Sequence, residues 1–400
     1  MRHLVTGTPA QPVSQTDPLP PPVTGADQGS FAWGVLHRRH PRVVEQVRNA
    51  NPYRPDQAEA LDRLAAEAGG VIGPLRADDH DGPAWREWGA EYLGRRWDEV
   101  PFLWAESFFY RRLLDAVDFF VPGPAYWLDP FAHLKTAELV DPALDAELAE
   151  LDWIADVDPG RRAGALLLAA LRGNRADLGF AAHAARFDVA ASTTVVVDDS
   201  ATLWARLGER AERVCVVADN AGRELLADLM LVDELLESGV VGEIALHVKP
   251  TPYYVSDATP ADVAAGLRRL GAAGGYAGAT ARRLQEAFRR GRIRLRTSWF
   301  AVAPFGFEAM PAELADEFAG AALTILKGDL NYRRLVGDRR WPVPTDLATA
   351  AAYFPGPVAV LRSLKSEVVL GVPEAQAAAL DRRSPDWRIA GTHAVLQVCG

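Results

Sequence analysis

The sequence is poor in cysteine. Only Cys215 and Cys399 occur in 400 residues, and they form no C-x-x-C pair. Two isolated cysteines cannot build a disulfide framework, which favours a reducing compartment. No apolar run approaches the ~18–20 residues needed to cross a bilayer. The start, MRHLVTGTPAQPV, also lacks the apolar core of a secretory signal. The sequence therefore predicts a cytoplasmic protein with no membrane partner.

Positive charge is also in deficit. There are 43 Lys and Arg residues against 53 Asp and Glu residues, so the formal net charge is −10. Neutralisation of phosphates supplies most non-specific affinity for nucleic acids, so this balance argues against a nucleic-acid partner. Hydrophobic residues make up 49% and charged residues 24% of the chain. That balance is typical of a globular protein and excludes a disordered or collagen-like one.

Several well-known catalytic motifs are missing. The sequence has no G-x-x-x-x-G-K-[ST], no H-E-x-x-H and no G-x-S-x-G. The glycine-rich stretch 271–280 does not fit G-x-G-x-x-G, and we interpret it as a loop between two helices. The chemistry must therefore be carried by other residues.

Three regions follow from composition and periodicity. Residues 1–29 are rich in proline and predict a mobile tail, with an extended arm as the alternative. Residues 30–190 carry apolar side chains at three- and four-residue spacing and predict a helical N-terminal lobe, with Ser30 as the first N-cap. The many aromatic residues of this lobe either form its core or, for a minority, line a pocket. Residues 191–400 predict an α/β domain that binds the metal and the phosphate described below.

The α/β prediction rests on short β-branched runs that alternate with helical stretches. Continuous apolar strands of this kind indicate a mostly parallel sheet covered on both faces. The sequence thus predicts a Rossmann-like, three-layer α/β/α core. Ligands of such sheets bind beyond the carboxyl ends of the strands. The predicted strands are 193–200, 213–220, 242–250, 322–331 and 358–365.

Acidic and amide side chains follow two of these strands. Asp219 and Asn220 end the strand at 213–220, and Asp257 follows the next strand. Carboxylate and amide oxygens suit Mg²⁺ or Mn²⁺. The alternative interpretation is that Asp219 with Asn220, and Asp257, cap the helices that follow both positions. Two acids at adjacent strand ends nevertheless fit one metal site better than two unrelated caps. His247 is interpreted as a hydrogen-bonded strand residue rather than a ligand.

Basic side chains follow two other strands. Lys327 and Gly328 begin the segment Lys-Gly-Asp-Leu-Asn, which includes Asp329 and Asn331. Arg362 and Lys365 follow the strand at 358–365. Lys365 has a plain alternative as a solvated charge. Acids at two strand ends and lysines at two others indicate a metal and a phosphate-bearing substrate, because phosphoryl transfer needs positioning and charge neutralisation.

Glu106 is a further candidate. It lies among apolar residues of a predicted helix, where an unpaired carboxylate is costly to bury. We expect it to contact the substrate or a basic partner such as Arg111. An ordinary surface salt bridge is the alternative.

The order of these residues resembles a known family. Three segments, Asp-Asn-Ala-Gly-Arg-Glu-Leu-Leu (219–226), His-Val-Lys-Pro-Thr-Pro (247–252) with Val-Ser-Asp (255–257), and Lys-Gly-Asp-Leu-Asn-Tyr-Arg-Arg-Leu (327–335), are similar to the metal-dependent damage-control phosphatases. The nearest branch is the sugar-phosphate branch, also described as the acidic-residue methyltransferase family. Glu106 with 110–112, and Asn174 with its neighbours, are similar to that branch too. The resemblance runs from about residue 30 to 380.

The resemblance implies roles for particular residues. It implies a divalent metal, Mn²⁺ first and Mg²⁺, Co²⁺ or Ni²⁺ as alternatives, on Asp219, Asn220 and Asp257. It implies contacts to a small phosphorylated substrate from Glu106, Asn174, Lys327, Gly328, Asp329, Asn331, Arg362 and Lys365. The family's Arg-Thr-x-Lys signature reads Arg362-Ser363-Leu364-Lys365 here, with serine in place of threonine. The segment 297–302 also departs from the family pattern.

The expected function is a metal-dependent phosphatase for small metabolites, such as fructose phosphate and other sugar phosphates, in metabolite damage control. Asp219 and Asn220 would act at the metal, and Asp329 would orient its loop or handle a proton. Attack by water and an aspartyl-phosphate intermediate on Asp219 both remain open. A carboxyl methyltransferase that uses S-adenosylmethionine, and a non-catalytic binding protein, are the alternatives. The oligomeric state is left open.

Overall fold

A computed structural model of the chain describes residues 18–76, 80–173, 194–208 and 210–400. Its centre is a seven-stranded sheet with the strand order β1-β7-β6-β5-β2-β3-β4. All neighbouring strands are parallel except β6 and β7, which are antiparallel. The strands are β1 (Thr194–Asp198), β2 (Ala211–Val217), β3 (Val241–Val248), β4 (Ile293–Thr297), β5 (Leu323–Lys327), β6 (Val358–Ser363) and β7 (His393–Cys399).

The predicted α/β class is confirmed, and all five predicted strands are present. The sequence analysis missed β4 and β7. Four of the five residues of β4 are not buried, so this edge strand lacks the continuous apolar run of a central one. β7 lies near the end of the chain and pairs antiparallel to β6, unlike the parallel pairs of the predicted strands.

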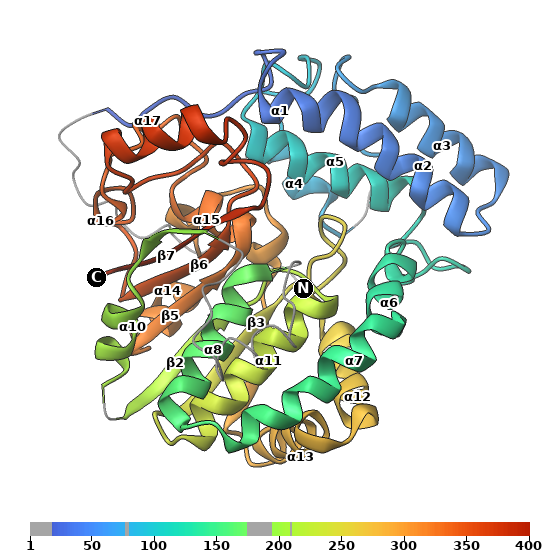
Figure 1. Cartoon of the computed structure of the whole chain (residues 1–400). Helices are drawn as coiled ribbons and strands as arrows, with labels where there is room; N and C mark the ends of the chain where they lie inside the picture. The colour runs from blue at the N-terminus through green and yellow to red at the C-terminus, as the bar shows by residue number, and fades with distance from the viewer. Residues whose placement is uncertain (1–17, 77–79, 174–193, 209) are drawn as a thin grey trace.

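The N-terminal helices form a lobe beside the sheet. Figure 1 shows them together above the strands. The lobe begins with one continuous helical segment in which Ser30 Oγ accepts a hydrogen bond from the Trp33 amide, as the sequence predicted for an N-cap. Its elements are α1 (Phe31–Gly34), the π-helical turn η1 (Val35–Arg39), α2 (His40–Ala50), α3 (Pro55–Ala66), α4 (Gly82–Trp88) and α5 (Phe102–Ala116).

Helix α5 is the centre of this lobe, and every one of its residues is buried. A helix that is buried all round must pair its charged side chains. Arg111 pairs with Asp81, Arg112 with Glu67, and Glu106 with Arg333 of α15 (Gly328–Leu335). The last of these pairs joins the lobe to the α/β domain.

The next helices pack with the helices that cover the sheet and not on α1–α5. Leu144, Leu166 and Leu171 belong to the same hydrophobic cluster as the strand residues Val214 and Val216. The hydrophobic core therefore divides earlier than the predicted boundary at residue 190. These helices are α6 (Ala132–Val140), α7 (Pro142–Glu150), the 3₁₀ helix η2 (Leu151–Asp156) and α8 (Pro159–Arg172).

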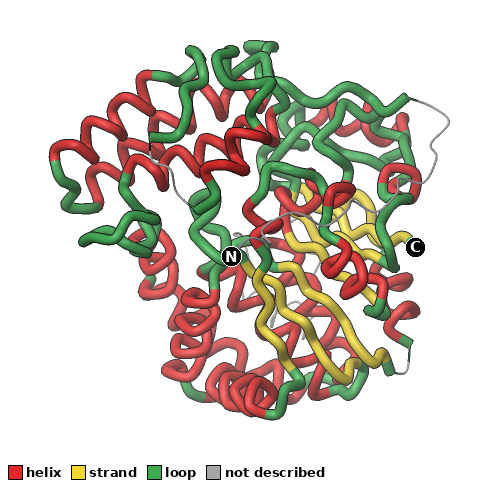
Figure 2. Tube along the Cα trace, turned by 180° about the vertical axis from the view of Figure 1, so that it is seen from behind, coloured by secondary structure: helices red, strands yellow, loops and turns green. Residues whose placement is uncertain are grey.

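Alternate residues of the strands face two different hydrophobic clusters, as the period of a strand requires. Val214 and Val216 of β2 face the cluster of α7, α8 and α11–α13, whereas Cys215 and Val217 face the cluster that continues into the N-terminal lobe. Figure 2 shows the strands from behind, with the first group of helices on the far side. The helices of the first cluster also include α10 (Ser200–Leu207), α11 (Gly222–Glu237), α12 (Pro260–Ala273) and α13 (Gly275–Arg289).

The remaining helices complete the C-terminal part. They are the 3₁₀ helices η4 (Trp299–Val302) and η5 (Phe307–Ala309), and α14 (Ala312–Ala319), α15, α16 (Leu347–Ala350) and α17 (Glu374–Arg383). The glycine-rich stretch 271–280 contains the break between α12 and α13 at Gly274, but most of it is helical. The predicted loop is therefore shorter than expected.

The proline-rich segment is only partly described. From residue 18 onward it is held against the protein, because the Val23 amide donates to the Asp338 carbonyl at 2.9 Å and the Phe102 amide donates to the Val23 carbonyl at 2.8 Å. Val23 is buried. For residues 18–29 these contacts favour the alternative of an extended arm over a mobile tail, and residues 1–17 lie outside the described part of the chain.

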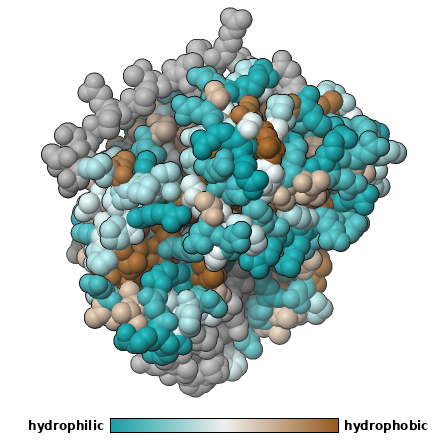
Figure 3. All heavy atoms as spheres, turned by 90° about the horizontal axis from the view of Figure 1, so that it is seen from above, coloured by the Kyte–Doolittle hydropathy of each residue, from teal (hydrophilic) through white to brown (hydrophobic). Residues whose placement is uncertain are grey.

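The face of the molecule seen in Figure 3 is mainly hydrophilic, with hydrophobic residues in small groups. Within the described ranges, no helix is both long enough and apolar enough to span a bilayer.

Candidate functional site

The order in which the chain adds strands to the sheet reverses between β2 and β5. From β2 the chain proceeds to β3 and β4 on one side, and β5 and β6 lie on the other side. Ligands of open α/β sheets bind at such a switch point, beyond the carboxyl ends of the strands. Asp219 follows β2 and Gly328 follows β5 at this place. The two touch, because a Cβ atom on Gly328 would lie 1.8 Å from Asp219 Oδ2.

Asp257 reaches the same place by a route that the sequence did not predict. It does not end a strand, since β3 ends at Val248. It pairs instead as an isolated bridge with Asn220. The Ala258 amide donates to the Asp219 carbonyl at 2.8 Å, and the Ala221 amide donates to the Ser256 carbonyl at 2.7 Å. These bonds bring together the three predicted metal ligands, and all three side chains are buried.

Burial and mutual repulsion change the acidity of the two carboxyl groups. Burial, followed by the charges of Asp257 and Glu224, raises the pKa of Asp219 well above its usual range. Burial also raises the pKa of Asp257 to about 6. Lys249 Nζ lies 3.6 Å from Asp257 Oδ2, and burial lowers the pKa of Lys249. Two carboxyl groups that resist ionisation together are stabilised by an added cation.

The oxygens present fit a hard divalent cation. Asp257 Oδ2 is buried and has no hydrogen-bond partner among the described residues. Asn220 Oδ1 accepts a hydrogen bond from Ser256 Oγ at 2.5 Å, and Asn220 Nδ2 donates to Asp219 Oδ2 at 3.1 Å. No group of three His, Cys, Asp or Glu side chains within the described ranges is arranged to hold a metal. The donor set is therefore two carboxylates and one amide, a composition suited to Mg²⁺ or Mn²⁺.

Helix α6 supports this cluster from outside. Lys135 Nζ donates to the Asp257 carbonyl and to Asp262 Oδ2, both at 2.9 Å. Glu138 Oε2 accepts from the Arg223 amide at the N-terminus of α11, at 3.2 Å. A carboxylate is favoured there by the free amides and the helix dipole. α6 thereby holds both segments that carry the candidate ligands.

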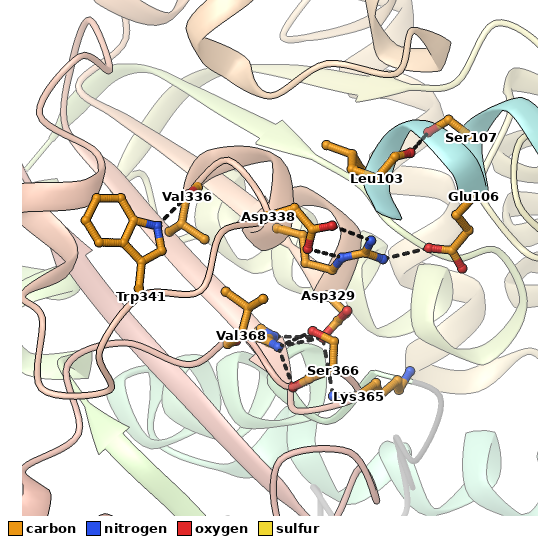
Figure 4. A network of polar contacts seen from close by, with 12 residues as sticks. Leu103, Glu106, Ser107, Asp329, Val336, Asp338, Trp341, Lys365, Ser366 and Val368 are labelled. Atoms are coloured by element: carbon orange, nitrogen blue, oxygen red, sulfur yellow. Dashed lines mark hydrogen bonds and ion pairs between the residues drawn. The ribbon is translucent and has the colours of Figure 1, made fainter. Parts of the chain in front are cut away.

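Asp329 is held in a network that Figure 4 shows. Its Oδ1 lies 2.7 Å from Arg362 Nη2 and accepts from Ser366 Oγ at 3.1 Å and from the Lys365 amide at 3.3 Å. Burial alone would raise the pKa of Asp329, but the charges of Arg362 and Arg333 together with the hydrogen bonds from Arg362 and Ser366 outweigh it, so the pKa lies below its usual range. An ionised, paired Asp329 is suited to orienting the loop and not to donating a proton.

Arg362 does not lie open to a substrate. It is fully buried, donates to the Val368 carbonyl at 2.5 Å, and lies 4.2 Å from the centre of the Tyr332 ring. Ser363 Oγ donates to the Arg172 carbonyl at 2.9 Å, at the end of α8. The hydroxyl of the serine that replaces the family threonine thus forms a hydrogen bond within the protein.

Lys327 also points into the protein. Its ammonium lies 3.0 Å from Asp228 Oδ1 and 3.9 Å from Glu224 Oε1, and it donates to the Ala170 carbonyl. Burial raises the pKa of Asp228 to about 7 in spite of this lysine. Asn331 is buried as well and donates to the Lys327 carbonyl at 2.8 Å and the Ala218 carbonyl at 3.2 Å. Both residues fix the ends of β2 and β5.

Lys365 is different. It is half-buried, and no described carboxylate lies within hydrogen-bonding reach of its ammonium. Figure 4 shows the ammonium pointing away from the Asp329 network. Its charge nevertheless counters the raised pKa values of Asp219 and Glu138, so it lies near both carboxyl groups. Among the predicted basic residues, this one is available for an anion.

Glu106 has a basic partner, as predicted, but this partner is Arg333 and not Arg111. Arg111 pairs with Asp81, whereas Glu106 Oε2 lies 2.7 Å from Arg333 Nη1. Arg333 also pairs with Asp338 at 2.8 Å. Arg111 lies on the same helix as Glu106, but its guanidinium points away from α15. Periodicity alone does not reveal this direction. Asn174 lies outside the described residues.

Sequence reasoning missed several charged residues around the site. Glu224 accepts from Asn220 Nδ2 at 2.9 Å, and its position four residues after Asn220, within one helical turn, was a usable signal. Asp228 lies one further turn along α11, on the same face. Lys135 carried no local signal for the site, because its contacts with Asp257 and Asp262 are more than 120 residues away in the chain, and its near neighbour Asp129 lies outside the site.

Comparisons with known proteins show which family the chain resembles. Residues 35–380 match the model of a family described as the damage-control phosphatase ARMT1-like domain. The chain is 27% identical to the damage-control phosphatase ARMT1 of Danio rerio over 95% of this chain and 97% of that protein. It is 28% identical to the ARMT1 of Xenopus tropicalis over 93% and 97%. The ARMT1 of Rattus norvegicus is 30% identical over 76% and 75%.

A solved structure is similar as well. The crystal structure of a DUF89 family protein from Pyrococcus horikoshii matches with a TM-score of 0.48 and 15% identity, over 88% of this chain and 93% of that one. The family match covers most of the chain, from η1 to α17, and includes every candidate site residue named above. The chain belongs to the family of damage-control phosphatases with an ARMT1-like domain.

Proposed function

We propose that this protein is a divalent-metal-dependent phosphatase that hydrolyses small phosphorylated metabolites, with sugar phosphates as the substrate class. The observation that carries the proposal is the pair of buried carboxyl groups, Asp219 and Asp257, at the switch point of the sheet with Lys365 nearby. Family membership supports a phosphatase.

Asp219, Asn220 and Asp257 would hold the metal, with Mn²⁺ as the first choice and Mg²⁺, Co²⁺ or Ni²⁺ as alternatives. A bound divalent cation polarises phosphoryl oxygens and lowers the pKa of water. Lys365 would meet the negative charge that remains on the phosphoryl group, since its ammonium has no described carboxylate partner. Gly328 lets the Asp219 carboxylate occupy the position that a side chain at 328 would fill.

The other predicted residues would act through these. Asp329 accepts a hydrogen bond from the Lys365 amide and so fixes the backbone from which the ammonium extends. Arg362 holds Asp329 in place. Lys327 and Asn331 hold the ends of β5 and β2 at the spacing that puts Gly328 against Asp219. These residues would position the site without touching the phosphate.

The test is phosphate release by the purified full chain after treatment with a chelator. Hexose and pentose phosphates are each assayed with Mn²⁺, Mg²⁺, Co²⁺ and Ni²⁺, and Asp219→Asn protein prepared in parallel controls for contaminating phosphatases. We expect release that depends on added metal and is lost in the variant. Release that is equal in the variant, or none with any metal, would overturn the proposal.

Lys365→Ala tests the phosphate contact in the same assay. A charge-assisted contact that strengthens in the transition state is worth about 2–4 kcal/mol. We therefore expect kcat/KM to fall by about tenfold or more, with the metal affinity unchanged. A variant that runs at the parent rate on every substrate would place the phosphate elsewhere.

A further inference from the structure

Two tyrosine hydroxyls near the site have no hydrogen-bond partner in the part of the chain that the structure describes. Tyr110 of α5 and Tyr254 of the segment that leads to Asp257 are both buried, and neither hydroxyl has a hydrogen-bond partner among the described residues. Their rings are stacked, with centroids 4.7 Å apart and planes at 23°. Buried polar groups are almost always hydrogen-bonded, so an unpartnered pair requires an explanation. Tyr253, the next residue, shows the ordinary case, since its hydroxyl donates to Ser107 Oγ at 2.6 Å.

The backbone at Tyr254 is strained. Its φ is +52°, in the left-handed region that residues with a bulky side chain rarely adopt. Such strain persists where the surroundings fix it, and it is concentrated at ligand and active sites. Here it directs the Tyr254 ring onto Tyr110, three residues before the candidate ligand Asp257. The strained residue, Tyr254, thus also carries one of the two unpartnered hydroxyls and stacks on the residue that carries the other.

A cation from the N-terminal lobe faces these hydroxyls. Arg39 ends the π-helical turn η1, and such turns are frequent at functional sites. The next residue, His40, is stacked on Phe109 with ring centroids 3.6 Å apart, which fixes the end of the turn. Arg39 is exposed and forms no ion pair with a described carboxylate. The nearby Tyr110, ahead of Glu106, Tyr254 and Asp329, raises the pKa of Arg39, so the guanidinium lies near these groups.

The charges below Arg39 indicate what would bind there. Two buried guanidinium groups, Arg333 and Arg362, face three carboxylates, Glu106, Asp329 and Asp338. The three carboxylates exceed the two guanidinium groups by one negative charge, and the guanidinium of Arg39 balances it. The region is therefore close to neutral and rich in donors, which suits hydroxyl groups better than a second phosphate.

We propose that Arg39, Tyr110 and Tyr254 form a subsite for the hydroxyl-bearing carbon chain of a sugar phosphate, a proposal that rests on the phosphatase function proposed above. The N-terminal lobe contacts the sugar, and the α/β domain contacts the phosphate. Arg39 donates to substrate oxygens, and the two tyrosine hydroxyls gain partners only when the substrate is bound. An ester without hydroxyl groups leaves all three unsatisfied.

The test compares a hexose phosphate with p-nitrophenyl phosphate, which has no sugar hydroxyls, at one saturating Mn²⁺ concentration. The variants are Arg39→Met, Tyr110→Phe and Tyr254→Phe. The matched controls are Arg38→Met, from the same turn but stacked over Trp33, and Tyr253→Phe, whose hydroxyl already has a partner. For Arg39→Met we expect the ratio of kcat/KM for the hexose phosphate to that for p-nitrophenyl phosphate to fall by about tenfold or more, and for each Tyr→Phe variant by about threefold or more.

Both controls should keep the ratio of the parent protein. An unchanged ratio in Arg39→Met, or an equal loss for both substrates, would overturn the subsite and leave the phosphatase proposal standing. If the parent protein releases phosphate from neither ester, the phosphatase proposal fails by itself. Calorimetric binding of the hexose phosphate with Mn²⁺ then decides the subsite: weaker binding by Arg39→Met than by Arg38→Met supports it, and equal or absent binding overturns it.

Discussion

Gly328 lies so close to Asp219 that no side chain fits between them. A Cβ atom at position 328 would be 1.8 Å from Asp219 Oδ2, and the backbone there has a φ of +80°. The glycine is thus required both by its conformation and by the space that it leaves beside a candidate metal ligand. These two requirements can be separated by experiment.

Gly328→Ala should abolish metal-dependent turnover, because the new methyl group must displace the Asp219 carboxylate. The matched control is Gly337→Ala. Gly337 has a similar φ of +75°, but the nearest atom to its added Cβ is the end of the Arg339 side chain, at 3.2 Å. Both variants should lose about 1–2 kcal/mol of stability from the left-handed backbone, measured by urea unfolding. Equal activity in the two variants would contradict the role given to this contact.

Asp219→Asn and Asp257→Asn should each make the metal-free protein more stable at neutral pH. Burial raises the pKa values of both groups, so the native state resists their ionisation, and an amide of the same shape removes that cost. Each variant should also lose the rise in Tm that Mn²⁺ gives the parent protein, since only a ligand that binds the native state stabilises it. Thermal unfolding with and without Mn²⁺ measures both effects. A full Mn²⁺ shift in either variant would remove that residue from the metal site.

Asp228 should give the metal-free protein a stability that falls between about pH 4 and pH 7. Its pKa in the native state is about 7, against a usual value of 3.8. Between these two values the native state binds more protons than the unfolded state, so raising the pH favours unfolding. Asp228→Asn should flatten this part of the profile of unfolding free energy against pH. An unaltered profile would mean that Lys327 keeps Asp228 ionised throughout.

Lys327→Met should destabilise the protein strongly, by about 3–5 kcal/mol, as expected when one partner of a buried ion pair is removed. The double variant Lys327→Met/Asp228→Asn should recover most of that loss, because the uncompensated carboxylate is gone. Chemical denaturation of the parent, the two single variants and the double variant gives the coupling energy. If Lys327 instead bound the phosphate in the open site, Lys327→Met would remain stable and lose activity alone.

The sequence predicted the sheet and the identity of the site residues better than it predicted their contacts. The β-branched runs marked the buried strands, and the polar residues after β2 and β5 marked their carboxyl ends. Arg362 and Lys327 looked like phosphate ligands because both follow strands, but both are buried against carboxylates. Their direction depends on Asp329 and Asp228, which periodicity does not connect to them.

Other features were out of reach for the same reason. Asp257 meets Asn220 through a loop that runs back from β3, and no local pattern specifies that pairing. Ser363 stands where the family has a threonine, and its hydroxyl bonds to the end of α8. Ser363→Thr is therefore expected to alter the packing against α8 and not the order of substrates. Long-range pairing and the direction of a buried side chain are properties of the packed structure.

Lys135→Met should weaken Mn²⁺ binding although Lys135 is no ligand. Its ammonium donates to the backbone carbonyl of Asp257 and to Asp262, so it holds the segment that presents the Asp257 carboxylate. Loss of a partner outside the ligands typically costs about 10–100-fold in metal affinity. Arg269→Met is the control, because Arg269 ties α12 to the end of α6 through the Leu139 carbonyl, at 2.8 Å, without touching Asp257. Mn²⁺ titration followed by calorimetry should show weaker binding in Lys135→Met alone, with both variants folded by circular dichroism. Equal affinities in the two variants would show that the Asp257 segment keeps its position without Lys135.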